Sequence, residues 1–137
     1  MDAKWGKLSP LTGWAVVVES NPTLRKLVVE TLAEIDLQSL VFESADAALI
    51  FLQQTQGGCP LVIVDQGVLG RLQGTEFIEL VNAKWPLTAA IFTSGYARDA
   101  SILPSSTMYL EKPWSLKDLV MAVASLLQLG RPLEKTS

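Results

Sequence analysis

Short runs of apolar residues alternate along the chain with segments in which apolar residues recur every three or four positions. The runs have the length of strands, and the spaced segments predict helices with one apolar face. This alternation is typical of a parallel sheet that is covered by helices. We expect strands at 14–18, 37–42, 61–64, 89–93 and 108–111, and helices within 20–35, 44–54, 75–85 and 115–129, with a short fifth helix within 96–107.

Polar residues mark where the predicted helices begin. Asn21 is an N-cap with Pro22 in the first helical position, Ser44 caps the second helix, and Ser115 with Asp118 forms a pair like a capping box. We expect the first helix to bury Leu24, Leu27, Val28, Leu32 and Ile35, and the last helix to bury Leu116, Leu119, Val120, Val123 and Leu127.

The run "LVIV" at 61–64 has no polar position, as expected of a strand that is buried on both faces of a sheet. We therefore place it in the centre of a doubly wound, five-stranded parallel sheet within an α/β/α sandwich, with right-handed crossovers. A chain of 137 residues is the size of one domain. We assign 1–12 to a flexible lead-in, 13–130 to the domain and 131–137 to a tail.

Composition narrows the possible functions. With 11 basic and 14 acidic residues and a net charge of -3, the chain lacks the basic surface that binds nucleic acid or an anionic membrane. Its single cysteine, Cys59, and its lack of histidine exclude an internal disulfide and a zinc site of thiolates. We expect a cytoplasmic protein whose chemistry uses at most a hard cation.

Polar residues stand at the carboxyl ends of four predicted strands, where open parallel sheets bind ligands. They are Glu19 and Ser20, Asp65, Thr93 and Ser94, and Glu111 and Lys112. A carboxylate that receives a phosphoryl group needs a cation, a lysine and hydroxyl donors beside it. The candidates are Asp65 as acceptor, Glu19 as cation partner, Lys112 as point charge and Ser94 as hydroxyl donor.

Four segments resemble the receiver domain of two-component response regulators, the CheY-like superfamily. They are "AVVVESNPTLRKLV", "LVIVDQ", "IFTSGYA" and "YLEKPWSLKDL", and the resemblance spans roughly residues 14–129. It implies the flavodoxin-like strand order 2-1-3-4-5. The residues "SGYA" and "EKPWSLKDL" in the last two segments resemble the receiver end of hybrid sensor histidine kinases.

The resemblance also implies roles for individual residues. Asp65 matches the phosphorylated aspartate, Lys112 the family's lysine, and Pro113 the proline whose peptide bond can be cis. Ser94 matches the hydroxyl that turns toward the phosphate, and Tyr109 the aromatic residue that rotates inward with it. The implied function is to accept phosphate from a sensor histidine kinase or a histidine phosphotransfer protein and to signal to a downstream protein. The only enzymatic activity implied is self-phosphorylation and autodephosphorylation.

The chain departs from the family pattern around the cation. Receivers carry two adjacent acids after the first strand, and this chain has Glu19 followed by Ser20. A hydroxyl is a poorer ligand than a carboxylate, so we expect Glu19 and Asp65 to bind Mg²⁺ weakly. The loop after Asp65 and the short stretch between Ser94 and Lys112 also differ from the usual pattern. These departures favour an alternative, a degenerate receiver that binds a protein partner without being phosphorylated.

An enzyme built on the same sheet fits less well. A phosphatase of the haloacid dehalogenase type has a second aspartate two residues after its nucleophile, where this chain has Gly67. The segment "ESNPT" is a poor match to the phosphate loop of a flavodoxin. Cys59 lacks a basic neighbour in sequence that would activate it as a nucleophile.

Overall fold

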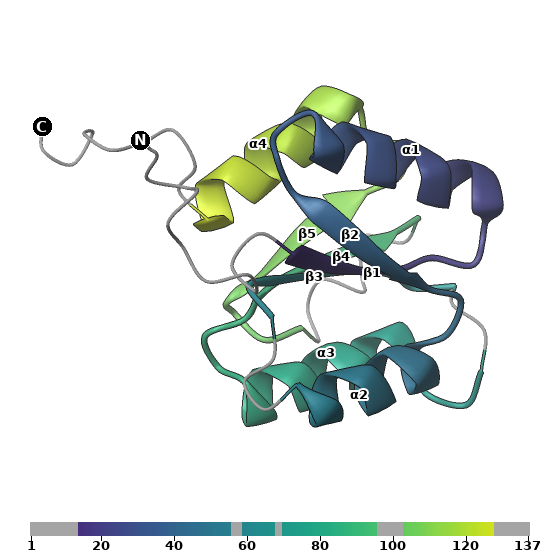
Figure 1. The fold of residues 1–137 in the computed structure, drawn as a ribbon, viewed down its shortest axis with the longest axis vertical. Coiled ribbons are helices and arrows are strands. Elements are labelled where there is room, and N and C mark those ends of the chain that lie inside the picture. The colour runs from purple at the N-terminus through teal and green to yellow at the C-terminus, as the bar shows by residue number, and fades with distance from the viewer. Residues whose placement is uncertain (1–13, 56–58, 68–69, 96–102, 128–137) are drawn as a thin grey trace, which may run out of the picture.

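The computed structural model describes residues 14–55, 59–67, 70–95 and 103–127. Within them five strands alternate with four helices (Figure 1). The strands are β1 (Trp14–Val18), β2 (Gln38–Phe42), β3 (Leu61–Asp65), β4 (Ala89–Ser94) and β5 (Thr107–Glu111). The helices are α1 (Pro22–Ala33), α2 (Ala45–Gln54), α3 (Gly74–Lys84) and α4 (Leu116–Leu127).

The strands form one parallel sheet in the order β2-β1-β3-β4-β5, which confirms the predicted strand order and fold class. Helices α1 and α4 cover one face and α2 and α3 cover the other (Figure 1). Strand β3 lies in the centre and all of its residues are buried, as the unbroken apolar run predicted.

Alternation along the strands divides the core into two layers. Odd-numbered positions of β1, β3 and β4 pack with α1 and α4, and even-numbered positions pack with α2 and α3. Because Asp65 continues the series of Leu61 and Ile63, its side chain belongs to the face covered by α1 and α4. This assignment decides which residues Asp65 can meet.

The predicted helix caps are present. The Asn21 side chain accepts hydrogen bonds from the N–H groups of Thr23 and Leu24, and Ser44 Oγ accepts one from Ala47 N. Ser115 and Asp118 bond reciprocally, each side chain accepting from the backbone N–H of the other residue. These contacts satisfy amide groups that the first turn of a helix leaves without an intrahelical acceptor.

Two expectations about the helices need correction. Leu27 and Leu116, expected to be buried, are 39% and 43% exposed because they line a groove between α1 and the start of α4. The short fifth helix was expected within 96–107, of which 96–102 lie outside the described residues. The described remainder is a turn, closed by Thr107 N donating to Pro104 O, that leads into β5. The assigned lead-in and tail also lie outside the described residues.

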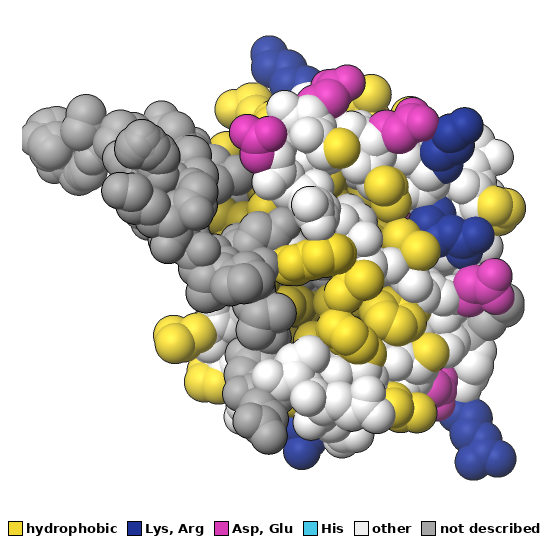
Figure 2. Space-filling model, in the orientation of Figure 1, with side chains coloured by type: hydrophobic (Ala, Val, Ile, Leu, Met, Phe, Trp, Pro, Cys, Tyr) yellow, Lys and Arg dark blue, Asp and Glu magenta, His cyan; other side chains and the backbone are white. Residues whose placement is uncertain are grey.

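The edge strand β2 presents an apolar surface. Hydrophobic side chains gather over it, between the two helical layers, on the face seen in Figure 2. Val41 on β2 is 44% exposed, and Ile50 on the neighbouring α2 is 58% exposed. Among the described residues, no helix is long and apolar enough to cross a membrane.

Gly74, the first residue of α3, lies where that helix packs against the end of β3. A Cβ atom added there would come within 2.9 Å of both the Asp65 backbone oxygen and Phe92 Cε1. We predict that Gly74→Ala lowers the free energy of unfolding by about 1–3 kcal/mol, because the added methyl overpacks the core. Urea denaturation measures the change. Gly95→Ala is the matched control, since nothing lies within 4 Å of a Cβ added at Gly95. Equal stabilities of the two variants would contradict the prediction.

Candidate functional site

Buried polar side chains gather at the carboxyl edge of the sheet. Among the described residues, the buried polar or charged ones are Glu19, Thr31, Asp65, Thr93 and Ser94. All except Thr31 lie at this edge, and Thr31 bonds to Leu27 O within its own helix. Polar groups are costly to bury unless they are paired. Their concentration at one edge of the sheet identifies the candidate site.

Asp65 is at the centre of the candidate site. Its Oδ1 forms a salt bridge with Lys112 Nζ and accepts a hydrogen bond from Thr93 Oγ1 at 2.8 Å. Its Oδ2 accepts a hydrogen bond from Gly67 N at 2.8 Å. The residue Asp65 is 7% exposed, so these donors replace most of the water that would otherwise solvate the charge of its carboxylate.

Strand pairing brings these donors together. Thr93 is the register partner of Asp65 on β4, and alternation directs both side chains toward the α1 and α4 face. Lys112 follows β5 directly, and its backbone N–H donates to Ser94 O at 2.8 Å. This bond extends the pairing of β4 and β5 by one residue and holds the lysine next to the end of β3. The Lys112–Pro113 peptide is cis.

Ser94 and Tyr109 belong to the opposite face of the sheet. Alternation places Ser94 with Phe92, on the side of α2 and α3. Tyr109 packs against Phe92, with ring centroids 6.4 Å apart, and its hydroxyl donates to Ser94 O at 3.3 Å. The two residues assigned to a switch are therefore connected, through the backbone of Ser94.

The contact between Thr93 and Asp65 was missed in the choice of site residues. Thr93 was noted only as a strand-end residue, and the hydroxyl role was assigned to Ser94. The alternation of side chains along β4 could have identified this contact. Thr93 lies two residues after Ile91, and Ile91 packs on the same face of the sheet as Ile63. Asp65 also occupies an odd-numbered position on this face. Of the two neighbouring hydroxyl residues Thr93 and Ser94, alternation therefore favours Thr93 as the one beside Asp65.

Glu19 is the second carboxylate of the site. It is 6% exposed, and its Oε2 accepts a hydrogen bond from Asn21 N at 3.1 Å. Burial raises the pKa of Glu19 above the usual 4.5, and the negative charge of Asp65 raises it further, although Asn21 N–H, Lys112 and Arg25 act in the opposite direction. Loss of solvating water around the buried carboxylate is therefore the main reason for the raised pKa, and the charge of Asp65 adds to it.

Ser20, which stands where receivers have a second acid, makes a structural contact. Its Oγ donates to Glu43 O at 3.1 Å, which ties the end of β1 to the end of β2. No group of three or more acids, histidines and cysteines that could hold a metal occurs among the described residues. The carboxylates of Glu19 and Asp65 are both buried at the carboxyl edge of the sheet, and the charge of Asp65 acts on Glu19. Both are hard oxygen ligands, and a divalent cation between them would offset their negative charges. They fit Mg²⁺, with one acid fewer than the family pattern.

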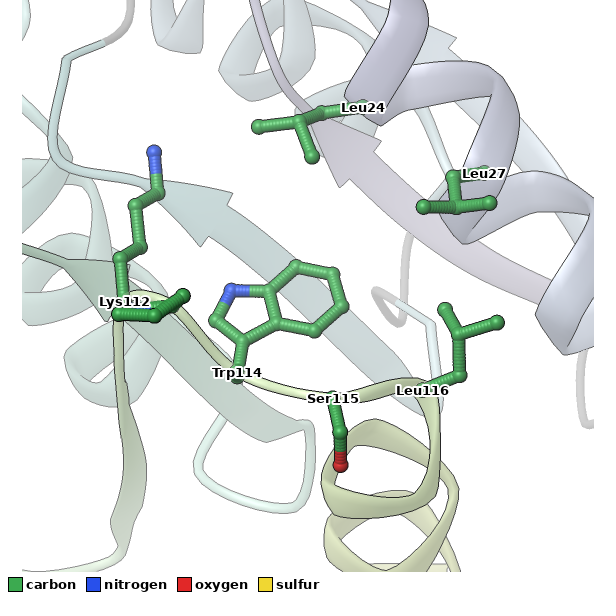
Figure 3. Close-up of a pocket in the computed structure, with 7 residues that line it drawn as sticks. Leu24, Leu27, Lys112, Trp114, Ser115 and Leu116 are labelled. Carbon is green, nitrogen blue, oxygen red and sulfur yellow. The ribbon is translucent and has the colours of Figure 1, made fainter.

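A groove of about 440 Å³ lies beside the site (Figure 3). Its walls are Leu24 and Leu27 of α1 and the segment Lys112–Leu116. The indole ring of Trp114 lies in the middle of the groove and faces the two leucines (Figure 3). Lys112 therefore lines the groove and also pairs with Asp65.

Cys59 is buried outside the site. Its Sγ donates to Leu61 O at 3.3 Å, and burial raises the pKa of the thiol to about 11. The thiol is protonated at neutral pH, so it is a poor nucleophile. This agrees with the expectation that Cys59 is not an activated nucleophile.

Comparison with solved structures identifies the fold. No protein-family model and no curated protein matches the sequence. A response regulator receiver protein from Sinorhizobium medicae WSM419 superposes with a TM-score of 0.77 at 20% identity, covering 85% of this chain and 95% of that chain. A CheY-like receiver domain protein from Methanospirillum hungatei JF-1 gives a TM-score of 0.76 at 18% identity, covering 92% and 99%.

A third structure, a response regulator receiver domain protein from Clostridium thermocellum, gives a TM-score of 0.75 at 21% identity and covers 85% of this chain and 94% of that chain. The chain has the fold of a response regulator receiver domain. Each of these matches spans nearly the whole of the other chain, so the similarity is that of a complete domain.

The raised pKa of Glu19 predicts a pH-dependent stability. Between 4.5 and its raised native pKa, Glu19 binds a proton more tightly in the folded chain than in the unfolded chain, so stability falls as pH rises through this window. Glu19→Gln removes the charge and keeps the shape. Without divalent cations, we expect the variant to melt about 2–4 °C above the wild type at pH 7 and closer to it at pH 4.

Thermal unfolding followed by circular dichroism measures these differences. Glu30→Gln, at an exposed position of α1, is the matched control and should differ from the wild type by the same small amount at both pH values. If the difference between Glu19→Gln and the wild type did not change with pH, the raised pKa would be wrong.

Proposed function

We propose that this chain is a receiver domain that accepts a phosphoryl group on Asp65 from a sensor histidine kinase or a histidine phosphotransfer protein. The observation that carries the proposal is the buried Asp65 carboxylate, which meets Lys112 at the carboxyl edge of a sheet with the receiver fold. A carboxylate paired with a lysine has the charge needed by a phosphoryl acceptor, and the fold is that of solved response regulator receiver domains.

The chemistry follows from the contacts of the site. An oxygen of Asp65 attacks the phosphorus of a phosphohistidine, a bond forms between that oxygen and phosphorus, and the bond between phosphorus and the imidazole nitrogen breaks. The imidazole leaves with the electron pair and takes up a proton. Lys112 offsets the charge of the phosphoryl oxygens. Mg²⁺, when held by Glu19 and Asp65, supplies further neutralisation of these oxygens.

The groove beside the site supports the docking of a donor protein. It is lined by apolar side chains from α1 and by Trp114, and it reaches Lys112. A partner that packs against these side chains would bring its phosphohistidine next to Asp65. Partial exposure of Leu27 and Leu116 fits a surface that a protein partner covers.

The signal leaves the site through Ser94 and Tyr109. In the proposed switch, phosphate favours the conformation in which Ser94 turns its hydroxyl toward the phosphoryl group. The Tyr109 hydroxyl is bonded to the backbone oxygen of Ser94, so movement of β4 at Ser94 changes the position of the tyrosine. A downstream protein would then recognise the altered surface beside β5. Beyond its own phosphorylation and dephosphorylation, the domain has no enzymatic turnover in this proposal.

Phosphorylation gives the direct test. We expect the protein, incubated with Mg²⁺ and acetyl phosphate or phosphoramidate, to gain the mass of one phosphoryl group, and we expect Asp65→Asn to gain none. Intact-protein mass spectrometry measures both. Asp36→Asn is the control, because Asp36 is exposed and has a φ of 66°, a conformation that asparagine also adopts. No mass gain with any donor, including candidate kinases, would contradict the proposed function.

A second candidate is a degenerate receiver that binds a partner without phosphorylation. It is favoured by Ser20, whose hydroxyl is bonded to Glu43 O at the position where receivers supply a second acid. The candidates differ in cation binding. If the chain is a phosphorylated receiver, we expect Mg²⁺ to produce a saturable change in tryptophan fluorescence, Asp65→Asn to abolish the change, and Ser20→Asp to move it to lower Mg²⁺ concentrations. Lack of saturation in both the wild type and Ser20→Asp would favour the degenerate receiver.

A further inference from the structure

The two oxygens of Asp65 have unequal hydrogen-bonding environments. Oδ1 has two donors, the Lys112 ammonium group and the Thr93 hydroxyl, whereas Oδ2 has the backbone N–H of Gly67. Gly67 has no Cβ, and one added there would lie 3.2 Å from Oδ2. Among the described residues, which do not include 68–69 of the same loop, Oδ2 therefore has fewer and weaker donors than Oδ1, and residue 67 has no side chain that would cover it.

The Thr93 hydroxyl is well placed to stay bonded to Oδ1 throughout a reaction. Thr93 is 2% exposed, it is paired in register with Asp65, and its Oγ1 is 2.8 Å from Oδ1. A buried hydroxyl in a strand that is otherwise largely apolar needs an acceptor, and Oδ1 supplies it. The side chain is thus held in place both by the sheet and by its own hydrogen bond.

We propose that Thr93 is a positioning residue that shortens the lifetime of the phosphorylated state. This inference rests on the proposed function. Oδ2 takes the phosphoryl group, and Oδ1 remains as the carbonyl oxygen bonded to Thr93 and Lys112. During hydrolysis, water attacks the phosphorus, the bond between phosphorus and Oδ2 breaks, and its electron pair returns to the carboxylate. The products are inorganic phosphate and the Asp65 carboxylate, and the water supplies the remaining proton to phosphate or solvent.

The Thr93 hydrogen bond strengthens along this path. Negative charge builds up on Oδ1 as the carboxylate forms again, and a hydroxyl bonds a carboxylate oxygen more strongly than a neutral carbonyl oxygen. The bond therefore favours the transition state for hydrolysis over the phosphorylated ground state. The hydrogen bond does not favour phosphorylation in the same way, because the Asp65 carboxylate loses negative charge as it attacks the phosphorus.

The experiment compares Thr93→Val with the wild type. After phosphorylation by phosphoramidate and removal of the donor, the decay of the phosphorylated protein is followed by mass spectrometry. Thr93→Val keeps the branched shape and removes the hydroxyl, and we expect it to lengthen the phosphate lifetime about three- to tenfold. Its rate of phosphorylation should stay within about twofold of the wild type or rise. A purely structural defect would slow phosphorylation, so the two rates separate the explanations.

Two further variants make the test specific. Thr93→Ser keeps the hydroxyl and should have nearly the wild-type lifetime. Thr88→Val is the matched control, because the Thr88 hydroxyl donates to Cys59 O at the opposite end of β4, and its loss should leave the lifetime unchanged. If Thr93→Val does not fold, Thr93→Ala removes the same hydroxyl without adding volume.

The outcomes are distinguishable. An unchanged or shorter lifetime in Thr93→Val, or equal lengthening in Thr93→Val and Thr93→Ser, would overturn the role of the hydroxyl while leaving the proposed function intact. Lack of phosphorylation of the wild type by any donor would overturn the proposed function, and this inference with it. A longer phosphate lifetime in Thr93→Val, with nearly the wild-type lifetime in Thr93→Ser and in Thr88→Val, would support both the proposed function and the role of the Thr93 hydroxyl.

Discussion

The buried charge of Asp65 is the constraint on which the rest of the site depends. A carboxylate at the end of the central strand is costly in an apolar interior, and removing its partners would leave an uncompensated charge. The salt bridge with Lys112 and the hydrogen bonds from Thr93 and Gly67 offset this cost. Each donor comes from a different segment, so the carboxylate is satisfied only when β3, β4 and the end of β5 are in register.

This dependence couples the chemistry to the fold. Lys112 reaches Asp65 because its backbone bonds to Ser94 O beside β4. Ser94 O also accepts the Tyr109 hydroxyl, from the side of the sheet covered by α2 and α3. A change of charge at Asp65 therefore acts on a lysine whose backbone partner is also the partner of Tyr109. The short path between the two faces of the sheet is a physical basis for the proposed switch.

Much of the fold was predictable from local pattern. The apolar run at 61–64 predicted a strand buried on both faces. The helix caps at Asn21, Ser44 and Ser115 were predictable because capping depends on residues three or fewer positions apart. The exposure of Leu27 and Leu116 was not predictable in this way. Helical period places both on an apolar face, and only the packing of α1 beside Trp114 decides that this part of the face remains open as a groove.

The sequence by itself determined the parallel α/β architecture and the candidates Asp65 and Lys112, because apolar period, capping and strand-end polarity are encoded within a few neighbouring residues. The tertiary structure decided which hydroxyl meets Asp65 and what Ser20 does. Both depend on contacts between distant segments: Thr93 lies 28 residues from Asp65 and Glu43 lies 23 from Ser20. Such partners are set by strand register and by the twist of the sheet, which no local window of sequence contains.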